Sequence, residues 1–74
     1  MTPTPTVLRS RALDLTDALY EAALDLTVAT INYGEQATTA NRDTYLRTRE
    51  ALNAAHTKLR EHLTRTARSD RTAA

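Results

Sequence analysis

Apolar residues recur along the first half of the chain with the spacing of a helix that packs along a seam. From Leu8 onwards the intervals between them alternate between four and three residues without interruption. We call this row the inner seam, and its members are Leu8, Ala12, Leu15, Leu19, Ala22, Leu26, Ala29 and Tyr33. Such an alternation keeps returning to one side of an α-helix and is typical of helices that pack lengthwise on a neighbour. The pattern predicts a helix over residues 7–33.

Residues that disfavour helix mark both ends of this segment. Pro5 has no backbone N–H to donate inside a helix, so residues 1–6 are predicted to be an extended lead-in, with Thr6 as the N-cap. Gly34 is the only glycine of the chain and follows Asn32 and Tyr33. It is expected to end the helix in the left-handed cap conformation. Residues 34–40 are then a short loop.

A second helix is predicted over residues 41–67. Asn41 is a favourable N-cap, and Asp43 suits the positive end of the helix dipole. The apolar residues on one face of this helix are Tyr45, Leu52, Ala55, Leu59 and Leu63. Two pairs at i,i+4 spacing, Asp43–Arg47 and Glu61–Arg65, are expected to add a few tenths of a kcal/mol each. Residues 68–74 are expected to form a frayed, basic C-terminal tail.

Two helices of similar length with a short connection predict an all-α fold, an antiparallel helical hairpin. A chain of 74 residues buries only about 60% of its unfolded surface and usually needs a disulfide, a metal or a partner to be stable. There is no cysteine, so disulfides and thiolate metal sites are excluded. Fourteen threonines weaken the helix preference further. The hairpin is therefore expected to depend on burial.

A second apolar row, the outer stripe, lies on the opposite side of the first helix. At about 100° per residue its members fall roughly opposite the inner seam. They are Leu13, Tyr20, Leu24, Val28 and Ile31. A helix that is apolar on opposite faces is normally enclosed by several neighbours, and one second helix can cover only one of these faces. The outer stripe is thus predicted to be a protein interface, in a homodimeric four-helix bundle with coiled-coil packing or with a partner protein.

Charge is distributed unevenly between the two predicted helices. Residues 1–35 contain two arginines against five carboxylates, for a net charge of −3, whereas residues 36–74 contain eight basic residues against four carboxylates, for +4. Four carboxylates, which we call the acidic ridge, run beside the outer stripe: Asp14, Asp17, Glu21 and Asp25. The charge difference favours either attraction between helices or a basic segment that contacts nucleic acid.

Nucleic-acid binding is the alternative function. The candidate phosphate contacts are Arg60, Arg65, Arg68 and Arg71, in the basic C-terminal half of the second helix and its tail. Against this alternative, the net charge is only +1 and the pI is about 8.2. No aromatic residue lies among these arginines to stack on bases. We therefore rank it below protein interaction.

The sequence contains no pattern that indicates catalysis, a metal or a cofactor. His56 and His62 are six residues apart, about 120° around a helix, so they cannot share an ion within it; each is expected at an edge of the apolar face. Both serines lie near the ends of the chain, and one glycine cannot form a glycine-rich phosphate loop. We expect a non-enzymatic helical interaction protein, regulatory or structural in role.

Nothing in the sequence predicts export or membrane insertion. Residues 1–6 lack the basic and apolar regions of a signal peptide. The longest uncharged internal run, residues 26–34, is far too short to span a bilayer. A cytoplasmic location without membrane contact is therefore expected, which also suits a chain without cysteine.

Overall fold

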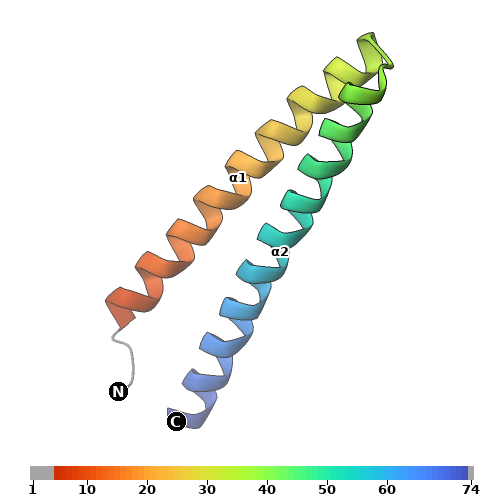
Figure 1. The fold of residues 1–74 in the computed structure, drawn as a ribbon. Helices are drawn as coiled ribbons and strands as arrows, with labels where there is room; N and C mark the ends of the chain where they lie inside the picture. The colour runs from red at the N-terminus through yellow and green to blue at the C-terminus, as the bar shows by residue number, and fades with distance from the viewer. Residues whose placement is uncertain (1–4, 74) are drawn as a thin grey trace.

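The protein is a rod made of two helices. The computed structural model describes the backbone of residues 5–73 and the side chains of residues 6–68. Helix α1 (Pro5–Glu35) and helix α2 (Thr39–Ala73) run antiparallel and are joined by residues 36–38 (Figure 1). The rod measures 54 × 16 × 16 Å, and α1 begins at the same end at which α2 finishes. The predicted all-α helical hairpin is confirmed.

Helix α1 extends two residues beyond each predicted end. It includes Pro5, which is compatible with the first turn of a helix because an N–H there has no intrahelical acceptor. It also continues through Gly34, which does not have a positive φ, so the predicted left-handed cap is wrong. The backbone N–H of Gln36 donates to the carbonyl of Asn32 at 2.9 Å, and this i→i−4 bond continues the helical pattern past the glycine.

Helix α2 is capped by Thr38 instead of Asn41. The Thr38 hydroxyl accepts a hydrogen bond from the backbone N–H of Asn41 at 3.1 Å, the bond that an N-cap side chain makes to the third helical residue. Asn41 instead closes the turn, because its side-chain amide donates to the carbonyls of Gln36 at 2.8 Å and Asn32 at 3.3 Å. At the other end the predicted frayed tail is helical through Ala73.

The predicted inner seam forms the contact between the helices. All eight of its residues are at least partly buried, and Ala29 is the most buried, with 4% of its surface exposed. The half-buried residues of α2 follow the same alternation of four and three: Asn41, Tyr45, Thr48, Leu52, Ala55, Leu59, His62 and Thr66. Near the turn, the rings of Tyr33 and Tyr45 pack with centroids 5.7 Å apart. The hairpin is thus held along one line of side chains.

The prediction that Leu63 shares this face is wrong, since 53% of its surface is exposed. Counting on from Leu59, the alternation reaches His62, and Leu63 lies one residue, or about 100°, past the contact. The ring Nε2 of His62 lies 3.2 Å from the carbonyl oxygen of Leu8, so this histidine joins the end of α2 to the start of α1. His56, in contrast, is exposed instead of bordering the contact.

Polar residues are tolerated in the contact because their side chains find hydrogen-bond partners, within the same helix for the threonines and on α1 for His62 and Asn41. The hydroxyl of Thr48 donates to the carbonyl of Tyr45 at 2.9 Å, and that of Thr66 donates to the carbonyl of His62 at 2.9 Å. Across the part of the chain that the structure describes, no buried side-chain nitrogen or oxygen lacks a partner. Threonines elsewhere on the helices, such as Thr27, bond in the same way to the carbonyl four residues earlier. Such bonds make threonine acceptable within a helix without making it favourable.

The hairpin has almost no core. Among the described side chains, Ala29 is the one apolar residue that counts as buried, and no large side chain is fully buried. Hydrophobic stabilisation scales with the apolar area removed from water, at about 25 cal/mol per Å². From a single line of half-buried residues we therefore expect the isolated hairpin to have a small free energy of unfolding.

We predict that Asn41→Ala destabilises the hairpin by about 1 kcal/mol, because it removes two hydrogen bonds that tie the end of α1 to the start of α2. Urea unfolding followed by far-UV circular dichroism measures this loss. Asn53→Ala is the matched control, since the Asn53 side chain is exposed on α2. It should be neutral or slightly stabilising, because alanine favours helix. An unchanged midpoint for Asn41→Ala would contradict the role given to this amide.

Candidate interaction surface

The outer stripe is fully open to solvent. Its five residues lie on α1 and are each between 51% and 70% exposed: Leu13, Tyr20, Leu24, Val28 and Ile31. Because the inner seam of α1 is turned towards α2, the opposite side of the same helix has no neighbour in the hairpin. The geometry predicted for the stripe, a row of large apolar side chains that α2 cannot cover, is therefore present.

The stripe is continuous over its C-terminal part and interrupted near its start. Tyr20, Leu24 and Val28 follow one another at four-residue intervals, and Ile31 comes three residues later. Residues at these spacings are neighbours on a helix surface. Asp17 stands between Leu13 and this group, so the carboxylate separates the first apolar side chain from the rest. The main apolar patch thus occupies the half of α1 nearer the turn.

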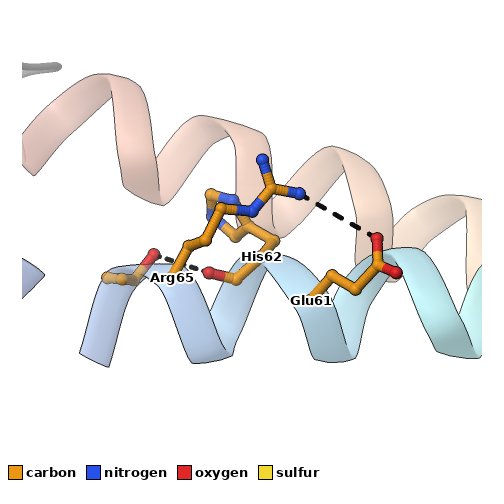
Figure 2. Close-up of polar contacts among 4 residues, drawn as sticks. Glu61, His62 and Arg65 are labelled. Carbon is orange, nitrogen blue, oxygen red and sulfur yellow. Dashed lines mark hydrogen bonds and ion pairs between the residues drawn. The ribbon is translucent and has the colours of Figure 1, made fainter. Parts of the chain in front are cut away.

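The acidic ridge forms no ion pair within the described part of the molecule. All four of its carboxylates are exposed, and none lies within 4.0 Å of a basic side chain there. The predicted ion pair between Glu61 and Arg65 does form, at 4.0 Å on the exposed side of α2 (Figure 2). The predicted Asp43–Arg47 pair is absent, and the Arg47 guanidinium instead donates to the backbone carbonyl of Asp43 at 3.5 Å. Helix α1 therefore presents carboxylates beside its stripe that form no ion pair in the described part of the hairpin.

A shallow, open groove of about 380 Å³ runs between the helices on the side of the acidic ridge. Small residues form half of its lining, and three charged groups reach it, from Glu21, Asp25 and Lys58. The small residues are Ala18, Ala22, Ala51, Ala54 and Ala55. Sequence reasoning did not find this groove, because it depends on how the flanks of the two helices face each other. The only signal was the pairing of alanines at short spacing on each helix.

The arginines proposed as phosphate contacts are partly brought together. Arg60, Arg65 and Arg68 surround a small depression on α2, but the carboxylate of Glu61 lines it as well. The carboxylate of Glu61 is paired with the guanidinium of Arg65 at 4.0 Å. The side chain of Arg71 lies outside the described residues. The depression is thus mildly basic and is not a continuous cationic surface.

Neither metal coordination nor membrane insertion finds support in the described part of the chain. No group of three histidine or acidic side chains there could hold a metal ion. His56 is exposed whereas His62 contacts α1, so the two histidines occupy different environments. No described helix combines the length and the hydropathy required to cross a bilayer.

We compared the chain with protein families, with curated proteins and with solved structures. No family model, no curated protein and no solved structure matches it. What this chain does is therefore inferred from the surface chemistry of the hairpin itself.

Proposed function

We propose that this chain is a small, non-enzymatic interaction or assembly protein that docks a helix of another chain on the outer stripe of α1. One observation carries the proposal: five large apolar side chains lie along one side of α1, each more than half exposed, on a hairpin in which Ala29 is the one buried residue among the described side chains. Scattered apolar residues are common on protein surfaces, but a contiguous apolar patch, here Tyr20, Leu24, Val28 and Ile31, is typical of an interface.

The gain from covering the stripe is comparable with the whole stability of a small domain. Removing about 300 Å² of apolar surface from water contributes about 7 kcal/mol before the costs of association are subtracted. The described hairpin does not gain this free energy on folding, because its two helices form a rod 16 Å thick and neither of them covers Tyr20 and Leu24. Docking would therefore stabilise the hairpin as well as bind the partner.

The covering helix can come from either of two sources. A second copy would give a homodimer, a four-helix assembly with the two α1 helices at its centre. A helix of a different protein would cover the same residues and would suit a regulatory or structural role. We propose a cytoplasmic location, because a chain without cysteine does not rely on an oxidising compartment.

We predict that Leu24→Glu combined with Ile31→Glu weakens assembly through the stripe by about 100-fold or more, because two charges would have to be buried without partners. The unmodified chain should exceed the monomer mass at tens of micromolar in sedimentation equilibrium, alone or with its native partner. The variant should be monomeric and less helical by circular dichroism.

The control is Glu50→Lys, which changes an exposed charge on α2 and should leave assembly unaltered. The proposal fails if the unmodified chain is a stable monomer with no partner and the double variant is equally stable. The outer stripe would then be ordinary exposed surface.

Nucleic-acid association is the second candidate, supported by the three arginines around the depression on α2. We expect at most weak binding to duplex DNA or RNA, because Glu61 lies among these arginines. If the candidate holds, three phosphate contacts should lower the affinity about 40-fold over a fourfold rise in salt. Fluorescence anisotropy with a labelled duplex measures both quantities.

The matched variants for this test remove the same charge from opposite ends of α2. Arg60→Ala, Arg65→Ala and Arg68→Ala together should abolish any such binding, whereas Arg42→Ala, Arg47→Ala and Arg49→Ala together should preserve it. A tight, salt-sensitive complex with this pattern would rank nucleic-acid binding above protein interaction.

A further inference from the structure

The outer stripe lies within the most acidic part of the chain. Between Arg11 and Arg42 there is no lysine, arginine or histidine. The same interval contains five carboxylates, all exposed: Asp14, Asp17, Glu21, Asp25 and Glu35. None of them forms an ion pair within 4.0 Å in the part of the chain that the structure describes. Any helix that covers the stripe therefore meets carboxylates that no ion pair of the described hairpin neutralises.

These carboxylates border the stripe on three sides. Asp17 stands at the N-terminal end of the main apolar patch, three residues before Tyr20. Glu21 and Asp25 follow one long side, and Glu35 lies at the far end, four residues after Ile31. Residues three or four apart on a helix are surface neighbours, so Asp17, Glu21, Asp25 and Glu35 each adjoin an apolar side chain of the stripe, and Asp14 directly follows Leu13. The remaining long side carries small neutral residues, such as Ala23 and Thr27.

We call these carboxylates around the stripe the acidic rim. The rim favours one covering helix over another, because a second copy of this chain and a helix of a different protein bring different charges to it. If the stripe of a second copy covered it, two identical rims would meet, and the contact would contain ten carboxylates with no basic residue between Arg11 and Arg42 of either chain. Like charges across a contact oppose association. A helix with lysine or arginine beside its apolar residues would instead place an opposite charge next to each carboxylate.

We infer that the outer stripe accepts an amphipathic helix with basic flanks, supplied by a different protein, in preference to the same stripe of a second copy. The inference rests on the proposed function and specifies the partner of that site. The distance from Leu13 to Glu35 along α1 is about 33 Å at the rise of an α-helix, so the partner helix needs about 20 residues to reach the whole rim.

Salt dependence gives the two occupants opposite signatures. Salt screens attraction between the rim and a basic helix, so that complex weakens as salt rises. Salt equally screens repulsion between two acidic rims, so a dimer formed through two α1 stripes tightens as salt rises.

The test uses the full chain and two synthetic helical peptides of about 20 residues with the same leucine stripe. One peptide carries lysine at the flanking positions and the other carries glutamate there. By fluorescence anisotropy at low salt, the lysine peptide should bind about tenfold more tightly, because each of three exposed ion pairs adds about a factor of two. The advantage should shrink as salt rises. A lysine peptide with a scrambled apolar pattern should bind at least tenfold more weakly, since charge alone does not fill the stripe.

Isosteric variants assign the effect to the rim. Asp17→Asn, Glu21→Gln and Asp25→Asn together should reduce lysine-peptide affinity about tenfold without weakening glutamate-peptide binding. Asp43→Asn, Glu50→Gln and Glu61→Gln together remove the same charge from exposed positions of α2 and should change the affinity by less than about twofold.

The two levels of the hypothesis fail differently. If Leu24→Glu with Ile31→Glu leaves both peptide binding and self-association unchanged, the stripe is not an interface and the proposed function falls. If that double variant abolishes an assembly, but the two peptides bind equally or the chain forms a stripe-dependent dimer that tightens with salt, only the inference about the partner is overturned.

Discussion

Two helices that pack side by side can bury only one row of side chains each, and they cannot enclose a core between them. This constraint determines the rest of the structure. The inner seam of α1 and the half-buried row of α2 form the entire contact between the helices, yet Ala29 is the one residue among the described side chains that is buried there. Every other face of both helices must remain exposed. The outer stripe is open for this reason, and a third helix is the element that would convert the line of contact into a core.

The same constraint explains why the contact includes polar residues. A closed core would penalise Thr48 and His62 heavily unless their partners were geometrically good. Here the contact is only partly shielded from water, and each polar side chain finds a carbonyl nearby, either in its own helix or, for His62, in the first turns of α1. Asn41 uses the same strategy at the turn, where it bonds to two carbonyls. The hairpin is therefore closed at the turn by an amide and joined near its open end by an imidazole.

Sequence reasoning succeeded where periodicity was unbroken and failed where residue type competed with it. The inner seam was predicted correctly at every position because its eight residues keep the alternation without a polar interruption. On α2, Leu63 was assigned to the contact because it is apolar, although the alternation of four and three residues places His62 there instead. Gly34 was predicted to cap the helix because it is a glycine. The hydrogen bond from the Gln36 N–H to the Asn32 carbonyl instead continues the helical pattern past it. The groove could not be predicted, because it arises from the relative rotation of two helices. The exposure of the stripe could be predicted from its spacing, whereas the helix that we propose to cover it is not encoded in the pattern of this chain.

The elongated shape has a hydrodynamic consequence. A rod of 54 × 16 × 16 Å experiences more friction than a sphere of equal mass, so it diffuses slowly for a chain of 8.2 kDa. A helix laid along α1 would thicken the rod without lengthening it. Docking would therefore lower the axial ratio while leaving the length almost unchanged. The frictional coefficient would then rise less than the added mass suggests. Binding of a helix along α1 would thus raise the mass of the particle and lower its axial ratio at the same time.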